Sequence, residues 1–98
     1  MKNIGILIFD QAEELDFVGP LEVFGMTAKL QPNSLHTFTV QQEGKVVKAV
    51  NGLRVIPDYS FRNCPKLDII LIPGGIGSRT EMKNSQTLNF VKRAAENC

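Results

Sequence analysis

The sequence predicts an α/β fold built on a mainly parallel sheet. Two runs of strand length, residues 4–9 and 67–72, are almost continuously apolar, as strands are when helices cover both faces of a parallel sheet. Segments with helical spacing lie between these runs and after them, which is the order typical of α/β proteins. A chain of 98 residues has room for one domain, which we expect to span residues 1–98.

A helix is expected to follow the first strand. Apolar residues recur at helical spacing over residues 13–29, but Gly19-Pro20 interrupts the pattern. Because proline suits a first helical turn and not a helix interior, the main helix should begin at Pro20. Asp16 would then lie in the turn before the helix.

The middle of the chain is expected to hold short strands joined by turns. The strands should lie at residues 36–40, 46–48 and 53–56, and the first of these alternates polar and apolar residues, as half-exposed strands do. Glu43-Gly44-Lys45 has the composition of a hairpin turn, and Asn51-Gly52 is a strong turn signal. A final helix should begin at Ser85 as its N-cap and run to about Asn97.

Composition excludes several classes of protein. Eleven basic and ten acidic side chains leave a formal net charge of +1, so nucleic-acid binding driven by phosphate neutralisation is not expected. No run approaches the roughly 20 apolar residues of a membrane helix. The first residues lack the apolar core of a signal peptide, and two cysteines are too few for a disulfide scaffold. These features predict a cytoplasmic protein.

A glycine loop follows the second apolar strand. Pro73-Gly74-Gly75-Ile76-Gly77 should lie at the carboxyl edge of the sheet, where open α/β sheets bind ligands. Backbone amides left free there could hold an oxyanion or a phosphate. The alternative is that Gly74 and Gly75 only form a strand-to-loop turn, and the spacing does not decide between the two. The chain lacks both Gly-x-x-x-x-Gly-Lys-Ser/Thr and Gly-x-Gly-x-x-Gly, so nucleotide binding is not predicted.

Asp16 is the candidate acid–base residue. It follows the first strand and is flanked by Leu15 and Phe17, neighbours that would desolvate the carboxylate and raise its pKa. A carboxyl group kept partly neutral is suited to proton transfer. The alternative is that Asp16 only caps the helix. Glu13 and Glu14 are expected to form a solvated first turn.

The remaining reactive side chains form no catalytic group. Cys64 precedes the second apolar strand, at the end of the sheet away from the glycine loop, and should be buried and inert. Cys98 ends the sequence, and His36 is the only histidine. No Cys–His pair and no metal-ligand spacing is present, so we expect neither a metal nor another cofactor.

Two segments resemble the ThiJ/PfpI superfamily, a class I glutamine amidotransferase-like group, and within it the isonitrile (isocyanide) hydratase branch. They are Leu15-Asp16-Phe17-Val18-Gly19-Pro20 with the strand before it, and Asp68–Arg79, which contains Pro73-Gly74-Gly75. The resemblance implies a flavodoxin-like three-layer sandwich, a homodimer and a small-molecule substrate. It further implies a lyase in which a cysteine thiolate on a strand-to-helix elbow attacks an isocyanide, yielding an N-substituted formamide. Asp16 matches the family's carboxylate, and Gly74 and Gly75 match its oxyanion pocket.

The family's nucleophile would lie beyond residue 98, because Cys98 falls several residues before the elbow position. The chain therefore resembles the N-terminal half of a family member, inactive alone, and its sheet should be incomplete, with exposed apolar surface. One alternative is the ligand-sensing domain of an AraC-type transcription regulator, since such domains often share this fold. Another is a stable module that dimerises without catalytic activity.

Overall fold

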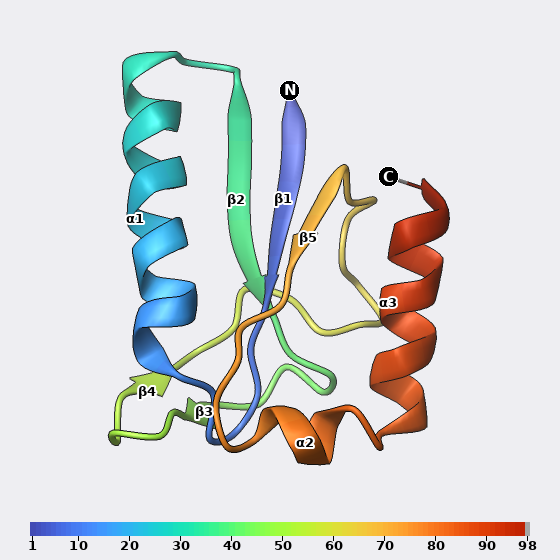
Figure 1. Cartoon of the computed structure of the whole chain (residues 1–98). Coiled ribbons are helices and arrows are strands. Elements are labelled where there is room, and N and C mark those ends of the chain that lie inside the picture. The colour runs from blue at the N-terminus through green and yellow to red at the C-terminus, as the bar shows by residue number, and fades with distance from the viewer. Residues whose placement is uncertain (98) are drawn as a thin grey trace.

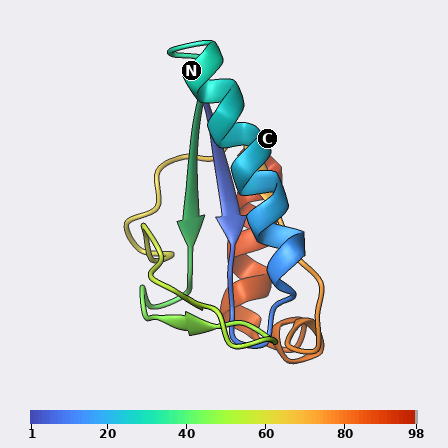
Figure 2. The ribbon, with the colours of Figure 1, turned by 90° about the vertical axis from the view of Figure 1, so that its left-hand side faces the viewer.

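A parallel three-stranded sheet forms the centre of the computed structural model, which describes residues 1–97. Strand order is β2-β1-β5, with β1 (Lys2–Leu7) between β2 (Leu35–Val40) and β5 (Ile69–Leu71). Helix α1 (Glu14–Leu30) packs beside β2, and α3 (Ser85–Asn97) packs beside β5 (Figure 1). Figure 2 shows α1 and the segment between β2 and β5 on opposite sides of the strands. The predicted α/β fold with a parallel sheet is confirmed.

Smaller elements gather at the carboxyl edge of this sheet. Strands β3 (Val47–Lys48) and β4 (Arg54–Val55) form an antiparallel hairpin, and α2 (Ser78–Glu81) follows the glycine loop. Figure 1 shows the hairpin, α2 and the start of α1 together at one end of the molecule, while β1 begins at the other end. Among the described residues, no helix has both the length and the apolar character needed to cross a membrane.

The core lies around β1. Residues 4–9 are all buried, as the continuous apolar run predicts, and Phe17 of α1 and Phe38 of β2 are almost fully buried beside them. The second apolar run behaves differently. Ile69 and Ile72 are 47% and 48% exposed, so the described residues do not fully cover this run. The expected exposed apolar sheet surface is therefore observed at β5.

Helix α1 begins earlier than predicted and passes through its proline. It starts at Glu14 and contains Pro20, so the expectation of a helix starting at Pro20 is wrong. Proline keeps a helical φ but offers no N–H to the carbonyl of Asp16 four residues before it. Phe17 before the proline is buried and Phe24 after it is half-buried. We attribute the unbroken helix to this packing on both sides of the proline.

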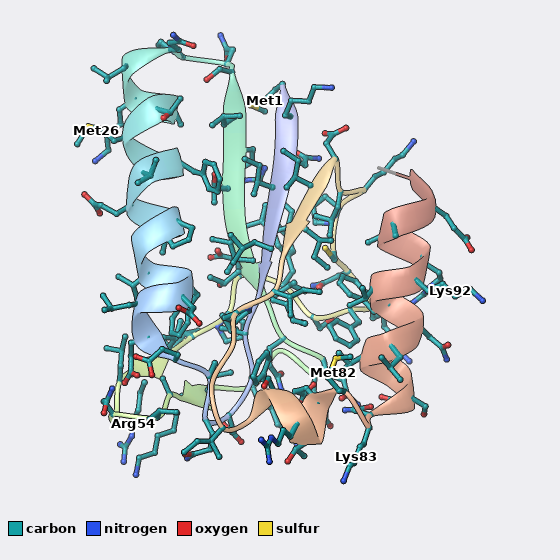
Figure 3. All side chains as sticks on the ribbon, viewed as in Figure 1. Met1, Met26, Arg54, Met82, Lys83 and Lys92 are labelled. Atoms are coloured by element: carbon teal, nitrogen blue, oxygen red, sulfur yellow. The ribbon has the colours of Figure 1, made fainter. Side chains whose placement is uncertain are left out.

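The outer face of α1, defined here as Leu15, Val18, Val23, Met26 and Leu30, is also apolar. Its side chains are between 38% and 76% exposed, and Met26 projects away from the strands (Figure 3). The solvent face of α1 therefore carries these apolar side chains beside the exposed charged residues Glu22 and Lys29. A surface helix normally carries polar residues on its solvent face.

Two further boundaries differ from the sequence prediction. The turn at Gly44 exists, with φ of 75°, but it is not a hairpin turn, because β2 pairs with β1 and β3 pairs with β4. Helix α3 begins at Ser85, but its cap is Asn84, whose Oδ1 accepts the backbone N–H groups of Gln86 and Thr87 at 3.0 and 3.4 Å. The amide side chain of Asn84 reaches both donors from the position before the helix, which is the ordinary geometry of an N-cap.

Candidate functional site

The predicted acid and the glycine loop meet at the carboxyl edge of the sheet. Asp16 lies in the first turn of α1, and its Oδ2 accepts the backbone N–H of Gly74 at 3.0 Å. In return, the carbonyl of Gly74 accepts the N–H of Glu13 at 2.9 Å. Residues 58 positions apart in the sequence are thus joined because β1 and β5 are adjacent and parallel, and their carboxyl ends share one edge.

The environment predicted for Asp16 is not observed in the described part of the chain. The Asp16 side chain is exposed, and Leu15 beside it is 76% exposed. Successive residues of a helix point about 100° apart, so Phe17 turns into the core while its neighbours turn outward. The expected desolvation of Asp16 is therefore wrong for these residues. The carboxylate keeps one oxygen on Gly74, and no described residue donates a hydrogen bond to the other, Oδ1.

Close backbone packing explains the glycines of the loop. A Cβ on Gly75, whose φ is 118°, would lie 2.6 Å from the backbone nitrogen of Glu13, and one on Gly77 would lie 2.0 Å from the carbonyl oxygen of Asp10. Both distances are far below van der Waals contact, so only glycine lets this loop pack against residues 10–13. Close packing of the loop therefore explains why positions 75 and 77 are glycine.

The same loop also presents free amide groups. The N–H groups of Gly75 and Ile76 donate to no acceptor among the residues that the structure describes. Both residues are exposed and belong to the loop in which Gly74 binds Asp16. Neighbouring backbone amides without partners can stabilise developing negative charge on an oxygen. The turn and the oxyanion pocket are thus compatible roles of one loop.

Glu14 makes contacts that the sequence did not predict. Its carboxylate accepts the backbone N–H of Asn51 at 2.8 Å, the Asn51 side-chain amide at 3.2 Å and the N–H of Leu53 at 3.4 Å. Desolvation raises the pKa of Glu14, but these bonds and one from its own N–H outweigh it and hold the pKa below its usual value. Glu14 lies in a partly exposed first turn as expected, and the contact with residues 51–53 is an addition to that role. No sequence signal marks the contact between Glu14 and the hairpin, since two of its three donors are backbone N–H groups.

Neither Cys64 nor His36 lies at this edge of the sheet. Cys64 is half-buried before β5, its thiol donates to the Pro65 carbonyl at 3.3 Å, and burial raises the pKa of the thiol. A raised pKa disfavours the thiolate, so Cys64 is a poor nucleophile. Cys98 lies outside the described residues. His36 is exposed and its ring contacts Phe38. No group of three potential metal ligands forms within residues 1–97.

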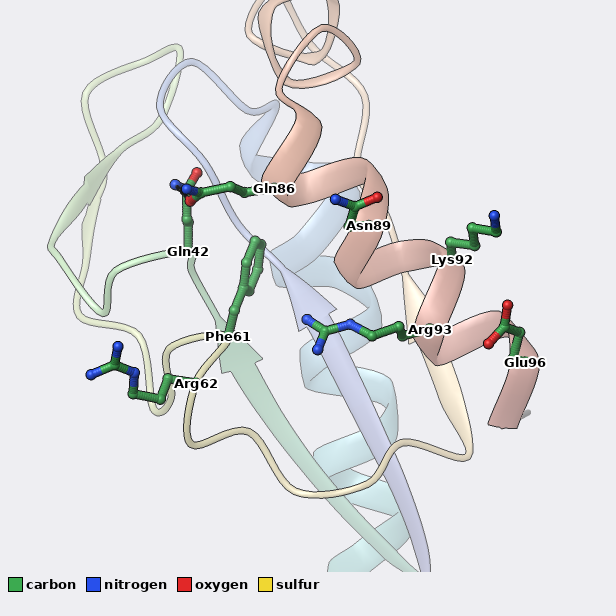
Figure 4. A pocket seen from close by; sticks show the side chains of 8 residues that line it. All are labelled: Gln42, Phe61, Arg62, Gln86, Asn89, Lys92, Arg93 and Glu96. Carbon is green, nitrogen blue, oxygen red and sulfur yellow. Dashed lines mark hydrogen bonds between the residues drawn. The ribbon is translucent and has the colours of Figure 1, made fainter.

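A separate groove lies elsewhere on the described part of the chain. A groove of about 920 Å³ runs along α3 (Figure 4), lined by Gln42, Phe61, Arg62, Gln86, Asn89, Lys92, Arg93 and Glu96. The Phe61 ring stacks on Phe90 with centroids 4.1 Å apart, and the Gln42 amide donates to the side chain of Gln86. The groove contains neither Asp16 nor the glycine loop, so it is separate from the site described above.

The parallel sheet, with a carboxylate from the first strand–helix connection held against a glycine loop of the neighbouring strand, defines a flavodoxin-like α/β domain. In this class, sites lie at the carboxyl ends of the strands. The chain belongs to the DJ-1/PfpI family, whose model matches residues 2–98. The resemblance to ThiJ/PfpI proteins found in the sequence is thereby confirmed.

Relatives with different functions share this domain. Isonitrile hydratase of Pseudomonas putida is 37% identical over 93 residues, covering 95% of this chain and 39% of that protein. The HTH-type transcriptional regulator GbdR of Pseudomonas aeruginosa is 29% identical over 77 residues, covering 78% of this chain and 21% of the regulator. The crystal structure of a ThiJ/PfpI family protein from Pseudomonas syringae superposes with a TM-score of 0.80 at 26% identity, covering 91% of this chain and 36% of that one. The chain thus spans well under half of each of these relatives.

Proposed function

We propose that this chain supplies the acid–base residue and the oxyanion pocket of an isonitrile hydratase-like enzyme. One observation carries the proposal: the Asp16 carboxylate binds the N–H of Gly74, in the same loop as the free N–H groups of Gly75 and Ile76. The 37% identity to isonitrile hydratase supports the choice of reaction. The nucleophile is a cysteine that lies beyond residue 98.

The proposed reaction adds water to an isocyanide, R–N≡C, and gives the formamide R–NH–CHO. The thiolate adds to the terminal carbon, and Asp16 in its acid form delivers a proton to that carbon, which leaves a thioimidate. Asp16, now a carboxylate, takes a proton from water as the water oxygen adds to the same carbon. The proton of the added hydroxyl moves to the nitrogen, and the resulting oxyanion expels the thiolate and releases the formamide R–NH–CHO, which leaves Asp16 again in its acid form.

The two carboxylate oxygens of Asp16 would have different roles in the reaction. Oδ2 is held by the N–H of Gly74 at 3.0 Å, which fixes the orientation of the carboxyl group. Oδ1, with no hydrogen bond from the described residues, is the oxygen that exchanges protons with substrate and water. The N–H groups of Gly75 and Ile76 would stabilise negative charge that develops on the water-derived oxygen.

The test is formamide production by the protein that carries this chain. Asp16→Asn should lower kcat/KM for an isocyanide by about 10²–10⁴-fold, the usual contribution of general acid–base catalysis. Glu22→Gln is the matched control, because Glu22 is an exposed carboxylate on the same helix, and it should leave the rate unchanged. No formamide from the unaltered protein, or an Asp16→Asn variant with full activity, would refute the proposal.

A ligand-sensing domain of an AraC-type transcription regulator is the second candidate. The match to GbdR over 78% of this chain favours it. The residues that follow position 98 in the source protein discriminate between the two candidates. An elbow cysteine after the next strand supports the hydratase, and a pair of helix-turn-helix motifs supports the regulator.

We also propose that the protein forms a homodimer through the outer face of α1. Leu15 and Leu30 at its two ends are 76% and 75% exposed, and Val23 between them is 63% exposed. Large apolar side chains exposed along the whole length of a helix are typical of an interface. Sedimentation velocity should show a dimer that Val23→Glu converts to a monomer. A protein that is monomeric at every concentration would contradict this.

A further inference from the structure

Glu14 binds the tip of the β3–β4 hairpin to the start of α1. Its two carboxylate oxygens receive three hydrogen bonds, from the backbone N–H groups of Asn51 and Leu53 and from the amide side chain of Asn51, at 2.8 to 3.4 Å. All three donors are neutral and lie in the hairpin. Among the described residues, Glu14 has no ion pair, so the hairpin contact rests on these hydrogen bonds.

The hairpin is also hydrogen-bonded along the segment that precedes Glu14. The N–H of Gln11 donates to the Lys48 carbonyl at 2.9 Å, and the N–H of Val50 donates to the Ala12 carbonyl at 3.0 Å. The N–H of Lys48 donates to Oδ1 of Asp10 at 3.0 Å. Residues 10–12 therefore have the hairpin as a direct neighbour.

The same segment is hydrogen-bonded to the glycine loop. The N–H of Gly77 donates to the Gln11 carbonyl at 3.0 Å, and the N–H of Glu13 donates to the Gly74 carbonyl at 2.9 Å. The segment 10–13 thus bonds to the hairpin and to the glycine loop at once. Two carboxylates of the next helical turn extend this arrangement, Glu14 to the hairpin and Asp16 to Gly74.

From this arrangement we propose that Glu14 is a positioning residue for the Asp16 site. Because Glu14 binds the hairpin tip, it stabilises the position of the segment 10–13 between the hairpin and the glycine loop. That segment in turn holds Gly74 within hydrogen-bond distance of Asp16. The inference rests on the proposed function only in giving Asp16 a catalytic role. The contacts themselves belong to the fold.

Protonation of Glu14 should loosen this hairpin contact, because a neutral carboxyl group is a weaker acceptor than a carboxylate. The charged groups of the elements packed around it are Lys48 and Arg54 on the hairpin, Asp10 and Glu13 on the preceding segment, and Asp16 on the same helix. The Asp10 carboxylate accepts the N–H of Lys48 in the same hairpin, so the experiment has to separate the two carboxylates by mutation.

Amide hydrogen exchange of the protein that carries this chain, followed residue by residue by NMR, tests the proposal. In Glu14→Gln, the amides of Asn51, Leu53 and Gly74 should exchange at least tenfold faster, while the amide of Ile6 in β1 keeps its rate. Glu13→Gln is the matched control, since no hydrogen bond to its side chain is formed by the described residues. In the unaltered chain, the proton shifts of Asn51 and Leu53 should follow an acid titration that Glu14→Gln abolishes.

Three results would overturn the proposal: an unchanged Gly74 amide in Glu14→Gln, equal acceleration in Glu13→Gln, or equal acceleration at Ile6, which would mean general loss of stability. Asn51→Ala is a second variant in case Glu14→Gln does not fold. It removes one of the three donors to Glu14, so the same amides should exchange faster, but by a smaller factor. None of these measurements requires catalysis. If no formamide forms but the Gly74 amide exchanges faster in Glu14→Gln, only the proposed function is refuted. If formamide forms but exchange of the Gly74 amide is unchanged in Glu14→Gln, only the role of Glu14 is refuted.

Discussion

A methyl group at position 77 should force apart two loops that now touch. The Cβ of Gly77→Ala would lie 2.0 Å from the carbonyl oxygen of Asp10, whereas ordinary contact begins near 3.4 Å. Both atoms are fixed by backbone, so no side-chain rotation relieves the overlap, and the loops must separate by about 1.4 Å. That movement would break the 3.0 Å hydrogen bond from the Gly77 N–H to the Gln11 carbonyl.

The expected loss of stability is about 2–4 kcal/mol. Overpacking of this kind costs about 1–3 kcal/mol, and a lost backbone hydrogen bond adds about 1 kcal/mol. Urea unfolding followed by circular dichroism measures the change, and the midpoint should fall by about 1–3 M. Because the glycine loop moves as well, the amide of Gly74 should lose its protection from hydrogen exchange.

Gly25→Ala is the matched control for this experiment. Gly25 lies inside α1, and a Cβ there would meet nothing within 4 Å. Alanine should therefore stabilise the helix by about 0.5–1 kcal/mol. A Gly77→Ala variant as stable as the unaltered chain would show that the loops are not packed as described, and a destabilised Gly25→Ala would show the same for the surface of α1.

Three further predictions follow from single contacts. Asn84→Ala should lower the free energy of unfolding by about 1–2 kcal/mol through loss of the α3 cap, whereas Ser85→Ala should leave it unchanged; equal effects in urea unfolding would reject Asn84 as the cap. The lowered pKa of Glu14 means that its contact adds stability above its usual pKa and loses it as pH falls through the lower folded value. Unfolding free energies measured from pH 7 to pH 3 should therefore decline less in Glu14→Gln than in the unaltered chain, and parallel curves would contradict the contact. Burial raises the pKa of Cys64, so in a Cys98→Ala variant its alkylation at pH 8 should be slower when folded than in urea, and equal rates would exclude the burial.

The sequence was sufficient to predict the sheet and the meeting of Asp16 with the glycine loop. Residues 4–9 are apolar without interruption, a pattern that requires burial on both faces and so identifies β1. Parallel strands bring their carboxyl ends to one edge, and this rule alone predicts that Asp16 lies near Gly74. Both predictions depend on patterns that are local in the sequence.

The predictions that failed depend on partners that a local pattern does not contain. Asp16 has apolar neighbours in the sequence, yet a helix turns them away from it, so its exposure could not be judged from adjacency. Pro20 breaks the helical pattern, but packing of α1 on the sheet carries the helix through it. Gly44 does mark a turn, although the turn composition says nothing about which strands pair on either side.

The open side of β5 has a consequence for the isolated chain. On the opposite edge of the sheet, Tyr59 bridges to Val40 and accepts a hydrogen bond from Gln41, so part of that edge is closed. Beside Ile69 and Ile72, no strand of the described residues covers the outer N–H and C=O groups of β5. Such an edge is a template for the addition of another extended segment, including a second β5. Aggregation of the chain on its own should therefore begin at residues 69–72, and a lysine in place of Ile72 should delay it.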